Sequence, residues 1–193
     1  VVLGSYAAWN GWQYWQRRQA AQASMLYTEL ERAASAGDAS RIERSLADMK
    51  DRYGGTWYAA EGSLVAAKAL ADKGQMAPAK EALTWAADKS SDEGLRAIAR
   101  LRLASLQKGD KAYDEAAKTL AASFPPAFTA LAADRRGDLL MLQGKRAEAA
   151  TEYGKAYQGL GAEGGDYRRL VGIKLNALGI DPDAGAKPAG AAS

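Results

Sequence analysis

DKGQMAPAKEALTWA, residues 72–86, decides the fold because its glycine belongs to a series that runs along the chain. Gly37, Gly74, Gly109 and Gly144 follow one another at intervals of 37, 35 and 35 residues. Each glycine stands between two runs of residues that favour helix. The other three stretches are SAGDASRIERSLADM (35–49), QKGDKAYDEAAKTLA (107–121) and LQGKRAEAATEYGKA (142–156).

The residues after each glycine repeat a second pattern. A small residue comes five positions later, a large one nine later and another small one twelve later, as in Ala79, Leu83 and Ala86. After Gly109 the match requires an insertion of two residues, Lys111 and Ala112. A period near 34 with a glycine turn between paired helices is typical of a tetratricopeptide repeat. The remaining matches are Ile42, Leu46 and Met49; Ala116, Leu120 and Ser123; and Ala149, Tyr153 and Ala156.

These patterns predict an all-α fold, a tetratricopeptide-repeat α-solenoid of three to four helix pairs with a C-terminal capping helix. The repeat domain is expected over residues 19–180, after the end of an anchor helix at 1–18 and before a flexible tail at 181–193. Helices are predicted at 5–36, 39–52, 57–73, 76–88, 92–108, 112–122, 127–143, 146–158 and 167–178.

Composition restricts the chemistry that the chain could perform. The sequence has no His and no Cys, so the commonest general base, thiol nucleophiles and most zinc sites are missing. The net charge of +3 is too small to favour nucleic-acid binding. Asp134 and Asp138 could share a cation, but two carboxylates supply too few oxygen ligands, and a surface charge cluster is the preferred interpretation. We therefore predict a non-enzymatic protein with no metal and no cofactor; a small enzyme that works through carboxylates is the disfavoured alternative.

The stretch YAAWNGWQYWQRR, residues 6–18, predicts a membrane interface. Trp and Tyr gather where hydrocarbon meets water, and a basic pair can mark the exit from the bilayer. Because the chain begins at Val1, we expect an upstream segment that completes the spanning helix. The alternative is an amphipathic helix that packs on its own domain or on a second copy, which would give a homo-oligomer. The predicted interface residues are Tyr6, Trp9, Trp12, Tyr14, Trp15, Arg17 and Arg18.

The first helix of each pair is expected to line a groove that binds an extended peptide or a partner helix. The opposing interpretation is that these charged residues only solvate an outer face. Counting back from each glycine places the following residues in the groove: Glu61, Leu64, Lys68, Arg96, Arg100, Leu103, Leu131, Asp134, Arg135 and Asp138.

Several longer stretches resemble the YfgM family of tetratricopeptide-like proteins, which are ancillary subunits of the SecYEG translocon. The resemblance covers most of residues 11–180. The stretches that carry it are GWQYWQRRQAAQAS (11–24), YGGTWYAAEGSLVAAKALADKGQMAPAKEAL (53–83), SDEGLRAIARLRLASLQ (91–107), AADRRGDLLMLQGKRAEAATEYGKA (132–156) and KLNALGI (174–180).

The resemblance implies a single-pass protein of the bacterial inner membrane whose domain faces the periplasm. It implies that the domain acts as a scaffold that binds SecYEG and a PpiD-like chaperone and assists newly translocated proteins. The tail after Ile180 is longer than the family pattern. The alternative function is an envelope assembly module that binds outer-membrane or cell-wall machinery.

Overall fold

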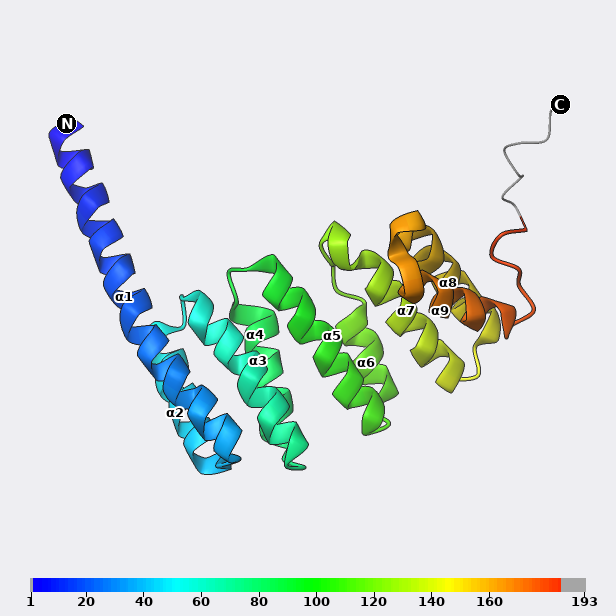
Figure 1. Cartoon of the computed structure of the whole chain (residues 1–193), viewed down its shortest axis with the longest axis horizontal. Helices are drawn as coiled ribbons and strands as arrows, with labels where there is room; N and C mark the ends of the chain where they lie inside the picture. Colours follow the sequence, from blue (N-terminus) through cyan, green and yellow to red (C-terminus); the bar gives the residue numbers. More distant parts are fainter. Residues whose placement is uncertain (1, 185–193) are drawn as a thin grey trace. The chain divides into compact units, whose positions relative to one another are not determined.

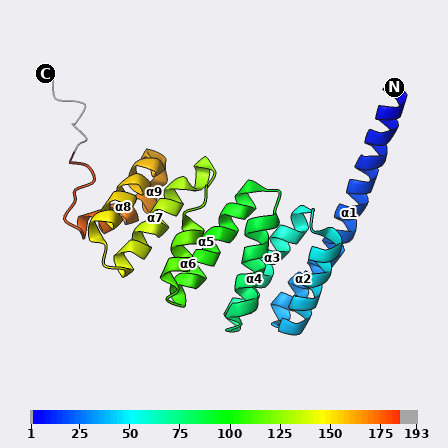
Figure 2. The ribbon, with the colours of Figure 1, turned by 180° about the vertical axis from the view of Figure 1, so that it is seen from behind.

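The computed structural model describes residues 2–184, and every regular element within them is a helix (Figures 1 and 2). The predicted all-α fold is therefore confirmed. The α-helices are α1 Val2–Ala36, α2 Ala39–Tyr53, α3 Trp57–Asp72, α4 Met76–Lys89, α5 Glu93–Gly109, α6 Tyr113–Leu120, α7 Pro126–Leu142, α8 Arg146–Leu160 and α9 Gly165–Asn176, with a short 3-10 helix at Ala162–Gly164.

The chain divides into two compact units. Unit 1 is Val1–Leu106 and contains α1 to α4 with most of α5. Unit 2 is Gln107–Ser193 and contains the end of α5 and α6 to α9. In unit 1, α3 contacts α1, α2 and α4, and in unit 2, α8 contacts α7 and α9. Each unit therefore has the helix-pair packing that the glycine period predicts.

Four turns share one backbone geometry, in which a residue in the left-handed region ends the first helix of a pair. The N–H of Gly74 donates to the carbonyl of Ala71 at 2.9 Å, and the N–H of Gln75 donates to the carbonyl of Leu70 at 2.9 Å. These two bonds satisfy carbonyls that the end of α3 would otherwise leave unpaired. The turn residues and their φ angles are Gly37 at 67°, Gly74 at 77°, Lys111 at 62° and Gly144 at 75°.

The third turn corrects the sequence prediction. Gly109 is the last residue of α5, and Lys111 takes the left-handed conformation instead. The N–H of Lys111 donates to the carbonyl of Lys108 at 3.1 Å, as the turn glycines do at the equivalent position. Ala116 and Leu120 then fall five and nine residues after the turn, so no insertion is present within the third pair.

The helix that follows this turn is shorter than predicted. α6 ends at Leu120, and the expected small core residue Ser123 is exposed beyond the helix. Pro125 and Pro126 begin α7 almost at once, and a residue before proline is pushed out of the helical region. Phe124 is buried here in place of Ser123.

Close helix contacts in three of the four pairs rest on an alanine, and the first pair has isoleucine at the same position. The residues five after each turn, Ile42, Ala79, Ala116 and Ala149, are completely buried. In unit 2, a Cβ atom added to Gly137 of α7 would lie 2.5 Å from Cε1 of Tyr153 in α8. The ring of Tyr153 therefore packs directly on the α7 backbone, and only glycine leaves room for it.

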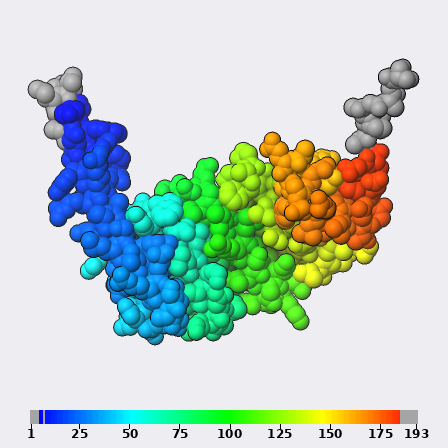
Figure 3. Space-filling view, in the orientation of Figure 1, coloured from blue at the N-terminus to red at the C-terminus, as the bar shows by residue number. Residues whose placement is uncertain are grey.

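Helix α1 packs in its second half and projects in its first half (Figure 3). Ala23, Leu30 and Ala33 are completely buried against unit 1. The hydroxyl of Tyr53 donates to Oε1 of Gln22 at 3.2 Å, near the start of this contact. The helix runs without a break through residues 18 and 19, so the predicted domain boundary falls inside one helix. Within residues 2–184, no helix is both long and apolar enough to span a bilayer.

The predicted tail begins with a short segment that packs on unit 2. The hydroxyl of Tyr157 donates to Oδ1 of Asp183 at 2.8 Å, and Arg168 lies 3.6 Å from the same oxygen. Arg168 also stacks over the Tyr157 ring at 3.7 Å. Residues 185–193 of the predicted tail lie outside the described residues.

Candidate partner-binding site

Unit 1 contains a groove with a volume of about 480 Å³, within the size range of natural ligand sites. It runs between the C-terminal end of α1 and one face of α3, with one side chain from α5. The structure brings together three of the predicted groove residues here, Glu61, Leu64 and Lys68. The other lining residues are Ala34, Ser35, Ala36, Gly37, Val65, Ala69, Asp72, Lys73 and Arg102.

The groove has an apolar floor and charged walls. Leu64 is almost fully buried, and Lys68 Nζ lies 2.6 Å from Oδ2 of Asp72 on the exposed side. Within the described part of the chain, the Lys73 ammonium and the Arg102 guanidinium make no hydrogen bond or ion pair. These two cations can therefore meet a carboxylate without breaking an internal contact.

Tyr27 of α1 has a raised pKa, and Glu61, which lines the groove, is one of the groups that raise it. Burial, and then the nearby Glu31 carboxylate, raise the pKa of Tyr27 to about 12. Glu61 adds to the same effect. Tyr27 packs on Tyr58 of α3 with ring centroids 5.7 Å apart. The phenol is thus held neutral and serves as packing between α1 and α3.

Three other predicted groove residues, Arg96, Arg100 and Leu103, lie elsewhere in unit 1. Nη1 of Arg96 donates to the carbonyl of Ser90 at 2.9 Å, and Nη2 of Arg100 donates to that of Ala87 at 3.5 Å. Both carbonyls belong to the C-terminal end of α4, where cations are favoured. Leu103 is buried in the apolar core of unit 1. Arg102, which the sequence reasoning did not name, faces the groove instead.

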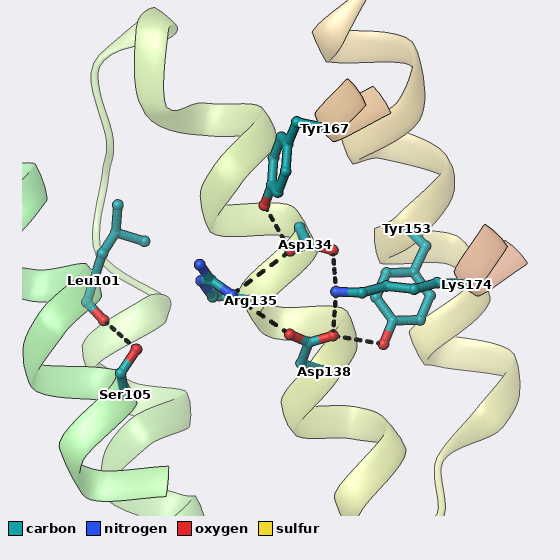
Figure 4. A network of polar contacts seen from close by, with 8 residues as sticks. All are labelled: Leu101, Ser105, Asp134, Arg135, Asp138, Tyr153, Tyr167 and Lys174. Carbon is teal, nitrogen blue, oxygen red and sulfur yellow. Dashed lines mark hydrogen bonds and ion pairs between the residues drawn. The ribbon is translucent and has the colours of Figure 1, made fainter. Parts of the chain in front are cut away.

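In unit 2 the structure places the predicted Asp134 and Asp138 in an internal polar network (Figure 4). Asp134 has no exposed surface, which differs from the expected surface cluster. Lys174 Nζ of α9 lies 2.7 Å from Oδ1 of Asp134 and 2.6 Å from Oδ1 of Asp138. The hydroxyl of Tyr167 donates to Oδ2 of Asp134 at 2.6 Å, and that of Tyr153 donates to Oδ1 of Asp138 at 2.9 Å.

This network joins α7 and α9 by ion pairs and α8 by the hydrogen bond from Tyr153. Arg135 adds longer contacts of 3.9 Å to Asp134 and 3.7 Å to Asp138. Burial, followed by the hydrogen bonds to the carboxylates, raises the pKa of Tyr153 and of Tyr167 above the ordinary value of 10. Both phenols therefore remain donors at neutral pH. The aspartates hold α9 in place, and the sequence could not reveal this because Lys174 is 40 residues from Asp134.

Leu131 and Arg135 occupy the same helix, α7, and both are partly exposed. They lie in unit 2, whereas the groove with Glu61, Leu64 and Lys68 lies in unit 1. The predicted binding residues therefore divide into a groove, a set of contacts at the end of α4, and the unit 2 network.

The predicted membrane-interface residues stand on the projecting half of α1. Its five aromatic side chains are between 51% and 68% exposed. The Trp9 and Trp12 rings lie 5.4 Å apart, and the Arg18 guanidinium lies 5.8 Å from the centre of the Tyr14 ring. Exposed aromatic residues grouped at this density are rare on a soluble surface and mark a contact region. The five are Tyr6, Trp9, Trp12, Tyr14 and Trp15.

No group of three or more acidic residues in the described range 2–184 is arranged to hold a metal ion. The described polar side chains form ion pairs and hydrogen bonds within helices and between them. Two features of the described residues that are open to a partner are the unit 1 groove and the aromatic half of α1.

A sequence profile of the tetratricopeptide repeat-like domain matches residues 1–180. An Escherichia coli protein named ancillary SecYEG translocon subunit is 35% identical over 154 residues, which cover 78% of this chain and 72% of that protein. The chain belongs to the YfgM family. A Neisseria gonorrhoeae protein of the same name is 28% identical over 156 residues, 81% of this chain and 74% of that protein. No solved structure matches the chain.

Membership of the YfgM family confirms the resemblance found in the sequence. The family is of a non-catalytic, protein-interaction kind. The matched region includes the groove of unit 1, the ion network of unit 2 and the aromatic half of α1. In a family of this kind the candidate functional sites are contact surfaces and not a reaction centre.

Proposed function

We propose that this protein is an ancillary subunit of the SecYEG translocon. It is a membrane-anchored scaffold of the inner membrane whose helical domain faces the periplasm. The domain holds a PpiD-like chaperone beside newly translocated chains. The observation that carries this proposal is the similarity, over about four-fifths of the chain, to relatives that are named as translocon subunits.

The projecting half of α1 supports the anchor. Trp and Tyr have an apolar ring and a polar group, so they are stabilised at the boundary between lipid and water. Trp9, Trp12 and Trp15 are spaced by three residues and form one slowly drifting stripe on the helix. Arg17 and Arg18 follow as the helix approaches the packed part of unit 1. An upstream apolar segment would place this stripe at the bilayer surface.

The groove of unit 1 supports the scaffold role. Its partly exposed apolar residues, Val65 and Ala69, suit the apolar side chains of an extended segment. The side-chain charges of Lys73 and Arg102, which have no partner among the described residues, suit acidic side chains of the same segment. A groove tethered to the membrane raises the local concentration of a bound chaperone near the channel. Weak contacts are then sufficient, because the second binding event is intramolecular.

Co-purification from native membranes tests the proposal. The full-length protein is isolated in mild detergent, and SecY and the PpiD-like chaperone are measured by quantitative mass spectrometry. We expect both to be enriched, and we expect the K73E/R102E variant to lose most of the chaperone. R146E is the matched control, because Arg146 is exposed and lies in unit 2. Enrichment of outer-membrane lipoproteins without SecY would contradict the proposal.

A further inference from the structure

One end of the unit 1 groove is formed by Gly37 and Lys73, which belong to the turns after α1 and α3. A Cβ atom added to Gly37 would lie 2.5 Å from Cε and 2.6 Å from Nζ of Lys73. The end of the Lys73 side chain therefore lies across the backbone of Gly37, in space that a side chain at position 37 would occupy. Gly37 thus has two roles at this turn: it adopts a φ of 67°, and it leaves room for the Lys73 ammonium.

This position holds the Lys73 ammonium beside the C-terminal end of α1. The C-terminus of a helix carries a partial negative charge, so a cation is stabilised there. A side chain that is already held in one place loses less conformational freedom when a ligand binds to it. The ammonium has no hydrogen bond or ion pair among the described residues, so its charge is available to a ligand in the groove.

The wall of the groove next to Lys73 is low. Three residues of the last turn of α1 line the groove, and all three have small side chains. The backbone of a ligand can therefore come close to this end of α1, within reach of the ammonium. These residues are Ala34, Ser35 and Ala36.

The two ends of the groove have opposite charge. Glu61 precedes Lys73 by twelve residues, which corresponds to about 18 Å along a helix. Glu61 and Glu31 both raise the pKa of Tyr27, so the two carboxylates act on the same region of unit 1. A distance of about 18 Å exceeds the Debye length of about 8 Å at physiological ionic strength, so each end acts on its own. An acidic side chain is attracted at the Lys73 end and repelled at the Glu61 end.

We propose that the Lys73 ammonium binds the carboxylate of one Asp or Glu side chain of an extended peptide, and that Gly37 is the residue that positions this ammonium. Apolar side chains of the peptide lie over Val65 and Ala69, and the part of the peptide near Glu61 carries no acid. This inference rests on the proposed function, because it assumes that the unit 1 groove holds a segment of a partner. It adds the chemical class of that segment and its orientation in the groove.

A random heptapeptide library displayed on phage identifies peptides that use this site. The library is selected in parallel on the 193-residue chain and on K73M. The C-terminus of each peptide is fused to the coat protein, so an acid that is enriched must be a side chain. We expect the peptides enriched on wild type alone to carry one Asp or Glu at a fixed distance from an apolar residue. Enrichment of the same peptides on both proteins, or of peptides without an acid, would overturn the proposal.

Fluorescence anisotropy then measures how strongly the groove prefers an acid. The best peptide is synthesised with an amidated C-terminus, beside a copy that has Gln in place of Glu or Asn in place of Asp. Wild type should bind the acidic peptide at least about 10-fold more tightly than the neutral copy, because a hydrogen bond to a charged group contributes this much. K73M should bind the two peptides equally. A preference that persists in K73M and disappears in R102M would assign the acid to Arg102 and overturn the proposal.

Two glycine variants separate the position of Lys73 from backbone strain. G37A should bring the preference for the acid below about 3-fold, because the new methyl group displaces the ammonium that makes the charged contact. G144A is the matched control: Gly144 has a φ of 75°, and a Cβ atom added to it would meet no described atom within 4 Å. A general loss of structure would weaken binding of both peptides and leave their ratio unchanged. An unchanged ratio in G37A, or an equal fall in G144A, would refute the role of Gly37.

The peptide measurements and the co-purification experiment can fail separately. Preference for an acid that depends on Lys73, together with membranes that yield no SecY, would refute the proposed function and support this binding site. Co-purification of SecY and the chaperone, together with equal affinity of wild type for the acidic and neutral peptides, would refute the binding site alone.

Discussion

Replacing Lys174 with Met tests the ion network that holds α9 in unit 2. The substitution keeps an unbranched apolar stem but removes the ammonium group, and with it contacts of 2.7 Å to Asp134 and 2.6 Å to Asp138. Asp134 has no exposed surface, so water cannot replace the lost ammonium group. Breaking a buried ion pair from one side costs about 3–5 kcal/mol. Tyr167 still donates to Asp134, and Lys174 is partly exposed, so we expect a loss of about 2–3 kcal/mol.

Hydrogen exchange of the α9 amides measures this loss directly. A loss of about 2–3 kcal/mol corresponds to exchange that is roughly 30 to 150 times faster. Tryptophan fluorescence reports the unfolding of unit 1, because all five tryptophans lie in that unit. It therefore serves as a reference for the stability of the unit that does not contain Lys174. The tryptophans are Trp9, Trp12, Trp15, Trp57 and Trp85.

Two further variants decide whether the cause is the uncompensated charge. K155M removes an ion pair of 2.6 Å to Glu152 in which the Lys155 side chain is 59% exposed. Arg136 still pairs with Glu152 at 2.7 Å, so we expect the variant to change stability by less than about 0.5 kcal/mol. D134N/K174M removes the buried charge together with its partner, and it should recover part of the loss. The reasoning is refuted if K174M exchanges like wild type, or if D134N/K174M is as destabilised as K174M.

Three other substitutions test the turns, the packing and the titration of the network. K111G should stabilise unit 2 by about 1 kcal/mol in urea unfolding, because Lys111 has a φ of 62° that glycine adopts without strain. G137A should destabilise unit 2 by about 1–3 kcal/mol, because its methyl group would lie 2.5 Å from the Tyr153 ring. The raised pKa of Tyr153 and Tyr167 contributes stability below pH 10 that is lost as pH rises through the folded-state values. Unfolding free energies measured from about pH 8 to pH 11 should therefore fall, and the fall should be smaller in Y167F.

The order of the helices could be predicted from the sequence because it depends on local signals. Gly37, Gly74 and Gly144 end helices where the period places them, and a left-handed residue strongly favours glycine. The glycine period places the third turn two residues early, because Lys111 adopts this conformation without being glycine. The spacing of Ala116 and Leu120 indicates the correct turn, since these residues lie five and nine positions after residue 111.

The candidate site was less accessible to sequence reasoning, because it depends on contacts between distant residues. Counting back from each turn selected Glu61, Leu64 and Lys68, which lie together in the unit 1 groove. The same counting selected Asp134, whose burial depends on Lys174, far along the chain. Nothing near Asp134 in the sequence indicates that α9 returns to cover it.

Site-specific photocrosslinking from the groove tests the central claim most directly. A photoreactive amino acid replaces Lys68 in the full-length protein, and the same residue at Arg146 in unit 2 serves as the control. The account predicts that illumination of intact membranes yields adducts with SecY or a PpiD-like chaperone from position 68, and far fewer from position 146. Adducts from position 68 with outer-membrane or cell-wall proteins alone would contradict it.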